Sequence, residues 1–344
     1  MNGQGMRRIL AGDIGGTKTI LGLFMPGDKR PRPEHVETYP SLDFPDLESI
    51  VKRFVDRYPV EVISACLGIA GPVIDGRCRA TNLPWEVSET SLAKSFGWSR
   101  VKLINDLVAL TYSIPRLEVG EVLSLNQAKP RMGSPMALLA PGTGLGQALL
   151  IDQEGHYKAI ASEGGHVDFA PRDDAEIDLW RYLHRQFGHV SLERVLSGPG
   201  IVNIYTWIKD SGRCGDSVGI LKGSKGPDLA PAITEAALQG SDPLCVEALN
   251  RFVSILGAAA GNLALIALTT GGVFLGGGIP PKIIPKLKER IFLEAFTGKG
   301  RFRNLLESIP VWVILNSEAA LVGAAIHAAA IHAAAIDALE VEHR

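Results

Sequence analysis

The sequence is poor in cysteine and carries almost no net charge. Its 344 residues include four cysteines, Cys66, Cys78, Cys214 and Cys245, which lie far apart and form no CxxC pair. Neither a disulfide framework nor a zinc knuckle is therefore expected, and a reducing cytoplasm fits best. Because 35 Lys and Arg residues oppose 37 Asp and Glu residues, the formal charge is −2. This balance does not indicate a nucleic-acid partner.

The sequence also lacks a convincing membrane segment. Residues 252–281 carry no charge, and Gly257 and Gly261 form a GxxxG pair, but Asn262 and two glycine clusters interrupt the run. We expect a buried helix here, followed by a strand and a turn. The uncharged stretch 319–336 is mostly alanine and predicts a packed C-terminal helix. The N-terminal residues reach glycines before an apolar signal core can form, so no membrane partner is expected.

Length and pattern indicate two α/β domains. At about 100 to 200 residues per domain the chain suffices for two, and strand-like runs alternate with helix-like runs almost throughout. Strands are predicted over 9–14, 19–24, 60–69, 101–104, 136–140, 148–151, 273–275 and 311–315. Helices are predicted over 46–58, 88–96, 107–113, 173–187, 192–196, 231–238, 243–268, 282–295 and 317–339, and loops over 26–33 and 211–227.

One sequence plan occurs twice. ILAGDIGGTKTILGLF, starting at Ile9, and LLAPGTGLGQALLI, starting at Leu138, each give an apolar strand, a glycine-rich turn with a threonine, and a second apolar strand. Each predicts a hairpin with a bare backbone tip, where N–H groups can converge on an anion. A single tip of this kind is often purely steric. Two tips, with a third glycine cluster over 271–278, favour nucleotide binding.

Two familiar nucleotide motifs are missing. A P-loop requires GxxxxGK[ST], and residues 12–17 supply no such lysine. A dinucleotide fingerprint requires GxGxxG at the start of a helix, whereas Gly142, Gly144 and Gly146 form GxGxG and continue into an apolar strand. Hydride transfer is therefore disfavoured.

Asp13 stands at the end of the first strand, just before the first glycine turn. A carboxylate there would repel phosphate unless a divalent cation lay between them, so Mg²⁺ held partly through water is the economical interpretation. Alternatively, Asp13 caps the turn without a metal. Thr17 and Thr143 either donate hydroxyls to phosphate or are β-branched turn residues of no special role.

Asn105 and Asp106 follow a buried strand and precede a helix. Ligands collect at the carboxyl ends of strands in open α/β sheets, and a carboxylate there can take a proton from a hydroxyl that attacks phosphorus. Either residue could equally be the N-cap of the next helix. The local sequence leaves these two interpretations equally open.

Glu163 to His166 read EGGH, a bent segment that exposes a carboxylate and an imidazole. Together these suit neighbouring sugar hydroxyls, although a structural histidine or a metal ligand are alternatives. Glu193 stands near the start of an expected helix, where the dipole favours negative charge. Taken alone, Glu193 has no functional signal.

A series of motifs resembles the bacterial glucokinases of the actin-like ATPase superfamily. The resemblance runs from Ile9 to Ala325, and it is to the non-repressor branch, since the cysteine-rich zinc motif of the repressor-related sugar kinases is missing. EGGHVDFAP and HVSLERVLSGPG are highly specific, whereas the glycine loops alone would indicate only the superfamily. The other motifs, in order, are GDIGGTKT, CLGIAGPV, ATNLPW, LINDLVAL, APGTGLG, GGVFLGGGI and EAALVGAA.

The resemblance implies a two-domain actin-like (ribonuclease-H-like) α/β fold with an interdomain cleft, divided into 1–113 plus 317–344 and 114–316. It implies ATP, Mg²⁺ and glucose as ligands, a homodimer, and phosphorylation of the glucose 6-hydroxyl as the entry step of glycolysis. By motif, Asp106 is the general base, and Asn105, Glu163, His166 and Glu193 bind the other sugar hydroxyls. The nucleotide residues are Gly12, Asp13, Ile14, Gly15, Gly16 and Thr17 at the first tip, Gly142, Thr143 and Gly144 at the second, and Gly276, Gly277 and Gly278 beside the adenosine.

Three rival functions are open. A kinase for another hexose, such as mannose or an amino sugar, would share these motifs. A sugar-sensing regulator would need a DNA-binding element, and the residues before Arg7 are too few for a helix-turn-helix. An actin-like filament or chaperone ATPase would hydrolyse ATP without sugar and would not need the polar residues of the EGGH and LERVL motifs.

Overall fold

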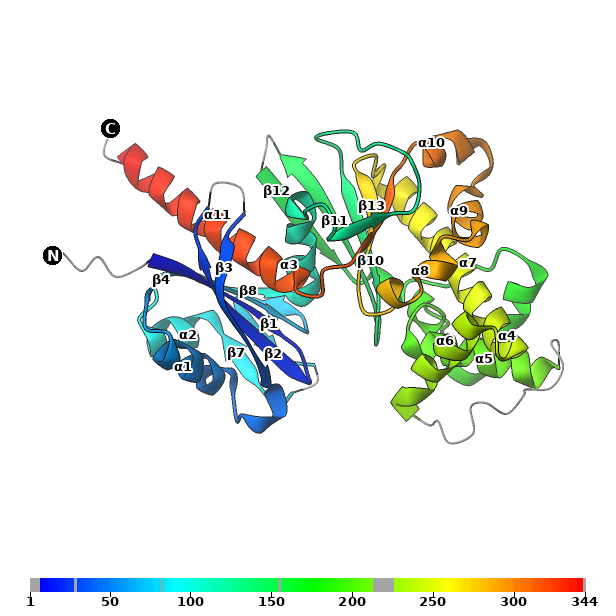
Figure 1. Cartoon of the computed structure of the whole chain (residues 1–344), viewed down its shortest axis with the longest axis horizontal. Coiled ribbons are helices and arrows are strands. Elements are labelled where there is room, and N and C mark those ends of the chain that lie inside the picture. The colour runs from blue at the N-terminus through cyan, green and yellow to red at the C-terminus, as the bar shows by residue number, and fades with distance from the viewer. Residues whose placement is uncertain (1–6, 28–29, 82, 154–155, 213–225, 343–344) are drawn as a thin grey trace. The chain divides into compact units, whose positions relative to one another are not determined.

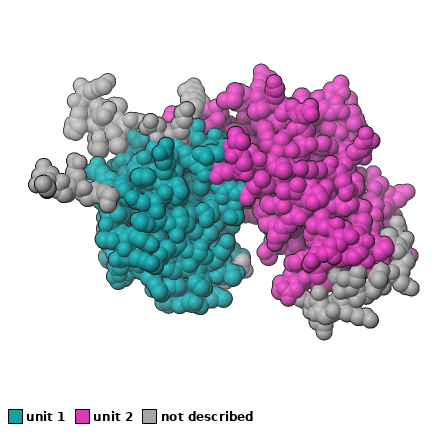
Figure 2. Space-filling model, viewed as in Figure 1, with its two compact units in different colours: residues 1–118, 316–344 teal, residues 119–315 magenta. Residues whose placement is uncertain are grey.

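The computed structural model describes residues 7–27, 30–81, 83–153, 156–212 and 226–342. For residues 336–342 it describes the backbone alone. Cys214 and most of the expected loop 211–227 fall outside the described residues. The chain divides into two compact units (Figure 2). Unit 1 is Met1–Glu118 with Asn316–Arg344, and unit 2 is Val119–Leu315. These borders differ by five residues and by one residue from the expected division at 113 and 316.

Unit 1 is built on a five-stranded sheet of order β3-β2-β1-β4-β8, with a small three-stranded sheet of order β5-β6-β7. In the large sheet, β1 pairs antiparallel with β2 and parallel with β4, and β4 pairs parallel with β8. The strands are β1 Arg7–Ile14, β2 Lys18–Met25, β3 Arg32–Pro40, β4 Glu61–Ile69, β5 Val73–Ile74, β6 Arg77–Arg79, β7 Glu86–Ser88 and β8 Val101–Asn105; the helices are α1 Leu47–Arg57, α2 Glu89–Phe96, α3 Asp106–Ser113 and α11 Ala319–Glu342.

Different helices cover the two faces of this sheet (Figure 1). Since side chains along β1 point alternately to the two faces, successive residues contact different helices. Leu10 and Ile14 pack in a cluster with α1 and α2. Ile9 and Ala11 pack in a second cluster with α3 and α11. Asp13 lies two residues after Ala11 and four after Ile9, so its side chain points to the same face of the sheet, which α3 covers.

Unit 2 repeats this strand order in a six-stranded sheet, β12-β11-β10-β13-β14-β9. Again a hairpin strand, β10, pairs antiparallel with its successor β11 and parallel with a later strand, β13. The strands are β9 Val122–Ser124, β10 Met136–Pro141, β11 Leu145–Gln153, β12 His156–Ser162, β13 Gly272–Leu275 and β14 Val311–Ile314; the helices are α4 Asp174–Phe187, α5 Gly198–Ser211, α6 Leu229–Gln239, α7 Pro243–Ala267, α8 Ile284–Leu287, α9 Arg290–Thr297 and α10 Arg303–Glu307.

Among the described residues, α7 is the one helix that is long and apolar enough to cross a membrane by length and composition. In this structure 67% of its apolar window is buried inside the protein. A Cβ on Gly257 or Gly261 would come within 2.3 and 2.4 Å of the carbonyl oxygens of Phe292 and Phe296, respectively. The GxxxG pair therefore lets α7 and α9 approach closely, as the prediction of a buried helix requires.

Most predicted elements are present, and the differences have local causes. Residues 192–196, predicted as a helix, form only a short 3₁₀ turn over Leu192–Arg194. The helix predicted over 282–295 is broken into α8 and α9 around Lys288 and Glu289. The edge strands β3 and β12 were not predicted, because their mostly exposed side chains lack the apolar alternation of a half-buried strand. The helix α5 was not predicted because glycines flank Pro199 at its start.

Candidate active site

The first glycine turn joins β1 to β2 in the expected antiparallel hairpin. Gly15, Gly16 and Thr17 form its tip, and Thr17 is exposed. Gly12 and Ile14, which were grouped with them by motif, lie inside β1 and are buried. A Cβ on Gly12 would come within 2.5 Å of a side-chain carbon of Leu67, so packing in the core explains this glycine.

A serine from outside the hairpin holds this tip. The backbone N–H of Ser41 donates to the carbonyl of Thr17 over 3.0 Å, and its hydroxyl donates to the carbonyl of Gly15 over 2.8 Å. The same hydroxyl lies 3.0 Å from that of Thr19, and both side chains are fully buried. Ser41 therefore fixes the tip at two backbone carbonyls, a role that no motif indicates.

Asp13 and Asp106 meet at the carboxyl edge of the unit 1 sheet. Asp13 is the penultimate residue of β1, and Asp106 is the first residue of α3, directly after β8. Gly68 of β4 allows this approach, since a Cβ there would come within 2.9 Å of Ala109 in α3. The topology thus brings two carboxylates from distant parts of the sequence to one place.

Both carboxylates have raised pKa values. Burial, and next the negative charge of Asp106, raise the pKa of Asp13 to about 6, while Lys18 lowers it. Burial also raises the pKa of Asp106, against the opposing effect of the Leu107 N–H, which donates to its carboxylate over 2.9 Å. Within the described residues neither aspartate forms an ion pair. Desolvated carboxylates without a cation are typical of sites that act on a ligand.

Asn105 has a structural role as the N-cap of α3. Its carbonyl oxygen accepts hydrogen bonds from the backbone N–H groups of Leu107 and Val108 at 2.9 and 3.4 Å. Its amide nitrogen donates to the carbonyl of Gly71 over 3.1 Å. Its side chain also hydrogen-bonds the Asp106 carboxylate, which opposes the rise in the pKa of that group. Of the two interpretations at this position, capping therefore applies to Asn105, and the general-base role of Asp106 stays a prediction.

The second glycine turn joins β10 to β11 in another antiparallel hairpin. Its tip is closed by a hydrogen bond from Gly142 N–H to the Gly144 carbonyl over 2.8 Å, and Gly198 N–H, at the start of α5, donates to the Gly142 carbonyl over 2.8 Å. Gly277 lies against the same hairpin with φ at 79°, and a Cβ there would come within 2.6 Å of the Pro141 carbonyl oxygen. Gly276 itself is buried.

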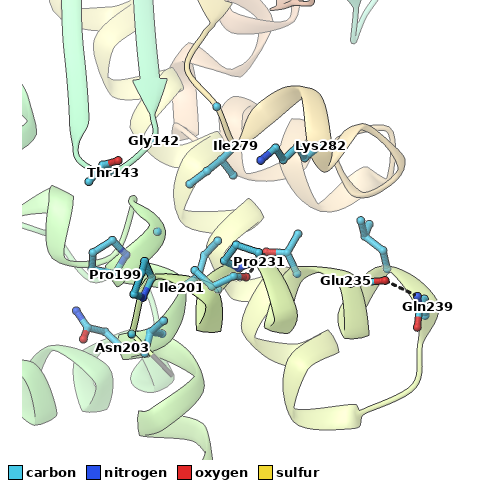
Figure 3. A pocket seen from close by; sticks show the side chains of 18 residues that line it. Gly142, Thr143, Pro199, Ile201, Asn203, Pro231, Glu235, Gln239, Ile279 and Lys282 are labelled. Atoms are coloured by element: carbon cyan, nitrogen blue, oxygen red, sulfur yellow. Dashed lines mark hydrogen bonds between the residues drawn. The ribbon is translucent and has the colours of Figure 1, made fainter. Parts of the chain in front are cut away.

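A pocket of about 880 Å³ opens beside this tip, entirely within unit 2 (Figure 3). Gly142 and Thr143 line one end of it, with Gly278 after β13. The remaining walls come from α5 and α6 and are mostly apolar, with Glu235, Gln239 and Lys282 as polar groups. Its volume lies in the range of small-molecule sites, about 300 to 1,000 Å³. The sequence prediction missed the α5 and α6 walls; the Ser197 cap before Pro199 was the signal that could have placed α5.

The EGGH segment crosses β11 at very close range. A Cβ on Gly165 would come within 2.1 Å of the Leu145 carbonyl oxygen, and one on Gly164 within 2.4 Å of Gln147 Oε1. The backbone of β11 therefore requires glycine at 165, whereas a side chain at 164 would displace the Gln147 amide. The side chains of Glu163 and His166 on either side of this pair are exposed, and within the described residues no hydrogen bond or ion pair engages them.

Glu193 lies between this loop and the second tip. The 3₁₀ turn that carries it is tied to the loop by Leu192 N–H, which donates to the Val167 carbonyl over 2.8 Å. Its carboxylate accepts the Leu145 N–H over 2.9 Å, and a Cβ on Gly144 would come within 2.6 Å of it. The structure therefore groups Glu163, His166 and Glu193 with the second tip in unit 2, and Asp13, Asn105 and Asp106 with the first tip in unit 1.

Comparisons with known proteins identify the family of the chain. A family model described as Glucokinase matches residues 10–331. The glucokinase of Synechocystis sp. is 43% identical over 342 residues, covering 92% of this chain and 96% of that protein. The glucokinase of Escherichia coli O139:H28 is 38% identical over 321 residues, covering 92% and 96%.

Solved structures show the same fold. A glucokinase crystal structure from an Antarctic psychrotroph aligns with a TM-score of 0.83 and 33% identity, covering 93% of this chain and 98% of that chain. A ROK family glucokinase from Streptomyces griseus, in complex with glucose and AMPPNP, aligns with a TM-score of 0.59 and 24% identity over 93% and 99% of the two chains. The second likeness concerns the fold alone.

The repeated sheet and its two glycine tips define a sugar kinase of the actin-like two-domain α/β fold, as the sequence predicted. The family match over nearly the whole chain is more specific. The chain belongs to the glucokinase family. The predicted enzyme class, a kinase, is confirmed with it.

Proposed function

We propose that this enzyme transfers the γ-phosphoryl group of ATP to the 6-hydroxyl of D-glucose, giving glucose 6-phosphate and ADP at the entry to glycolysis. The observation that carries the chemistry is Asp106, a desolvated carboxylate with a raised pKa and no cation partner at the end of β8. A pKa closer to neutrality makes a carboxylate a stronger base.

Asp106 is the proposed general base. It takes the proton of the 6-hydroxyl as the oxygen attacks the γ-phosphorus, and ADP leaves from the opposite side. The backbone hydrogen bond from Leu107 holds the carboxylate in place. Because little covalent chemistry is required of the protein, positioning and charge stabilisation supply most of the rate.

The residues at this edge fit Mg²⁺. Asp13 offers a hard carboxylate ligand whose pKa is raised to about 6 in the absence of a cation. Among the described residues no three His, Cys, Asp or Glu side chains cluster as a metal cage. Mg²⁺ commonly keeps several waters and uses one or two carboxylates with substrate phosphates, so this donor set suits it. When bound, the ion would neutralise charge on the phosphates, with Asp13 as its protein ligand.

The donor nucleotide is assigned to the tips and the pocket. The glycine tips 15–17 and 142–144 would bind phosphate oxygens through backbone N–H groups, with hydroxyls from Thr17 and Thr143. The mostly apolar pocket of about 880 Å³ would take the adenosine, with Gly278 at its mouth. Gly277 supports this arrangement because its positive φ is favoured by glycine.

The acceptor sugar is assigned to Asn105, Glu163, His166 and Glu193. Glu163 and His166 have no protein partner in the described structure, so they can bind hydroxyls at little cost. Glu193 accepts one backbone hydrogen bond and retains acceptor capacity for a hydroxyl. Asn105 would have to exchange one of its hydrogen bonds, to Gly71 or to Asp106, for one to the sugar.

The test of the reaction is a coupled ADP-release assay with glucose, mannose, glucosamine and a no-sugar control. Turnover with glucose far above every other sugar is expected. A higher kcat/KM for another hexose would move the substrate to that sugar. ADP release that does not depend on sugar would favour the ATPase rival, and no turnover at all would favour a sugar sensor.

Sugar recognition is tested separately by calorimetry with glucose. Glu163→Gln, His166→Ala and Glu193→Gln should each weaken glucose binding about tenfold or more, as expected for a hydrogen bond to a polar ligand. Glu294→Gln, on the exposed part of α9, is the control. Unchanged glucose affinity in any one of the three variants would remove that residue from the sugar site.

We also propose that the enzyme is a cytoplasmic homodimer that binds neither nucleic acid nor membranes. The near-neutral charge, the burial of α7 and the three buried free cysteines, Cys66, Cys78 and Cys245, support this proposal. Light scattering should give twice the mass of one chain. A monomer that retains full activity would contradict the dimer.

A further inference from the structure

Unit 2 contains a second pocket, of about 320 Å³, that shares no lining residue with the pocket of Figure 3. Residues 167–172, which continue from the EGGH segment, form one wall, and one side of α7 forms another. Its volume is at the lower end of the range for small-molecule sites. None of its lining residues belongs to the proposed catalytic or sugar-binding set.

Small apolar side chains leave the space. Ala258 and Ala259 of α7 lie at the base and are 5% exposed, and Phe169 and Leu263 beside them are also buried. Ile266, at 77% exposure, is the exposed apolar residue of the α7 side. The lining therefore suits a short, branched apolar group.

Lys299 supplies a charge that nothing in the pocket neutralises. Its ammonium donates to Asn262 Oδ1 over 2.5 Å, and the described residues provide no ion-pair partner. Burial, and next the positive charge of Arg172, lower the pKa of Lys299. The negative charge of Glu176 opposes these two effects, but Glu176 is itself paired with Arg172, and no described carboxylate of the lining pairs with Lys299.

Of the two other charged groups in the lining, Arg172 is paired and Asp168 lies largely in solvent. Arg172 donates two side-chain hydrogen bonds to Glu176, which is fully buried. The Asp168 carboxylate lies 3.1 Å from His189 Nε2, and 90% of its side chain is exposed, so solvent rather than an ion pair screens its charge. An incoming anion would therefore meet Lys299 as its cation and Asn262 as an amide donor.

We propose that this pocket binds a small organic carboxylate with a short branched apolar group, its carboxylate on Lys299 and Asn262 and its apolar part over Ala258 and Ala259. An anion replaces the amide oxygen as the acceptor for the ammonium, which gives a charge-assisted hydrogen bond in place of a neutral one. The apolar group leaves water for a surface that is already largely dry.

Occupancy should also strengthen glucose binding, a consequence that rests on the proposed function. Val167 and Asp168 follow His166 directly, and Leu192, which precedes Glu193, lines the same pocket. A ligand that contacts these residues orders both segments before sugar arrives. The protein therefore loses less conformational entropy when it binds the sugar. The glucose dissociation constant should fall about fivefold at saturating carboxylate, and glucose should tighten carboxylate binding by the same factor.

The test is calorimetry on the full chain with 3-methylbutanoate and with its uncharged isostere, 3-methylbutanamide. The acid should bind at least about tenfold more tightly than the amide, which is the range of a charge-assisted hydrogen bond. Lys299→Met should abolish this preference. Lys288→Met, an exposed lysine outside the pocket, should preserve it, and Ala258→Leu should exclude both ligands by filling the space. Thermal unfolding of each variant confirms that it is folded.

Equal binding of acid and amide, or a preference that survives Lys299→Met, would overturn the assignment of the charge. No binding of either ligand to the wild type would overturn the site. Acid binding that leaves glucose affinity unchanged would overturn the coupling. A wild-type protein that binds the acid yet fails to phosphorylate glucose would refute the proposed function and leave the carboxylate site standing.

Discussion

Units 1 and 2 have the same strand order around their glycine hairpins, but they treat desolvated negative charge in opposite ways. In unit 1, Asp13 and Asp106 meet at the carboxyl edge, form no ion pair with any described residue, and have raised pKa values. In unit 2, the fully buried carboxylate of Glu176 accepts three hydrogen bonds from Arg172. Unit 1 thus leaves the charge of its two aspartates without an ion pair among the described residues, whereas unit 2 neutralises the charge of Glu176 with Arg172.

The difference separates function from structure. An unpaired desolvated carboxylate costs stability, so it persists where a ligand or metal completes it. A paired one contributes to stability only while both partners remain, because removing one strands the other in a low-dielectric interior. Variants of unit 1 acids should therefore lose activity and keep their stability, whereas variants of the unit 2 pair should do the reverse.

The largest effect is expected for Asp106→Ala. Loss of a positioned general base should lower kcat by about 10² to 10⁴ fold while glucose binding largely survives. Urea unfolding should show no loss of stability, because the variant removes a desolvated charge. Asp56→Ala, on the exposed side of α1, is the control. Turnover close to that of the wild type would exclude Asp106 from the mechanism.

Arg172→Met should produce the opposite outcome. It leaves the Glu176 carboxylate fully buried with its cation removed, which should cost about 3 kcal/mol of unfolding free energy. Arg181→Met breaks only an exposed pair with Asp178 and should cost less than about 1 kcal/mol. Urea unfolding compares the two. Equal, small losses would show that the buried pair has no special weight, and the contrast between the units would fail.

Asp13→Asn should have an intermediate effect, confined to the metal. If Asp13 holds Mg²⁺ partly through water, the Mg²⁺ concentration for half-maximal rate should rise about 10- to 100-fold, while the rate at saturating Mg²⁺ falls less. Titration of activity with Mg²⁺ measures this directly. An unchanged Mg²⁺ requirement would return Asp13 to the alternative role of a turn cap.

Unit 1 also contains a histidine that should make it sensitive to acid. His327 of α11 stacks on Tyr112 of α3 with ring centroids 4.4 Å apart, and burial lowers its pKa to about 4. An unfolded histidine has a pKa near 6.5, so between these values the unfolded chain binds more protons and stability falls as the pH falls. The loss from pH 7.5 to pH 5 should be about 2 kcal/mol.

His327→Phe keeps a stacked ring without a titrating group. Urea unfolding at the two pH values should therefore show a smaller acid loss in this variant than in the wild type, while other titrating groups contribute equally to both. The same acid loss in both proteins would mean that His327 does not carry the effect.

The sequence predicted the features that repeat a local pattern. The two glycine hairpins follow from an apolar strand, a bare turn and a second strand, and the structure forms both. The position of Asp106 follows from the rule that ligands collect at the carboxyl ends of strands. The capping role of Asn105 was one of two open interpretations, and only the hydrogen bonds to Leu107 and Val108 decide it.

The features that escaped prediction depend on contacts between distant segments. The edge strands β3 and β12 have little apolar alternation because one side of each is solvated. The pocket walls from α5 and α6 are defined by where the chain returns to the second tip. Glu193 was assigned to the sugar only through its motif, and its contact with the Leu145 N–H was not predicted. Ser41 is the clearest example of a contact that was not predicted. No sequence pattern around it indicates that it binds the carbonyls of the first tip.

The smallest effect concerns how each unit holds its tip. Unit 2 uses the backbone N–H of Gly198, which only a change to proline would remove, whereas unit 1 uses the Ser41 hydroxyl in addition to the Ser41 backbone N–H. Ser41→Ala leaves the Gly15 carbonyl without this donor and the buried Thr19 hydroxyl without its acceptor. The cost should be about 1 to 2 kcal/mol of unfolding free energy.

Thr19→Val combined with Ser41→Ala separates the two contributions. If the stranded Thr19 hydroxyl causes most of the destabilisation, the double variant should be more stable than Ser41→Ala alone, because both polar partners are gone. The tip remains loosened in both proteins, so the KM for ATP should be raised about equally, while the KM for glucose changes less. Restored ATP affinity in the double variant would show that the hydrogen bond from Ser41 to Gly15 does not position the first tip. Ser41 would then have no role comparable to that of Gly198 at the second tip.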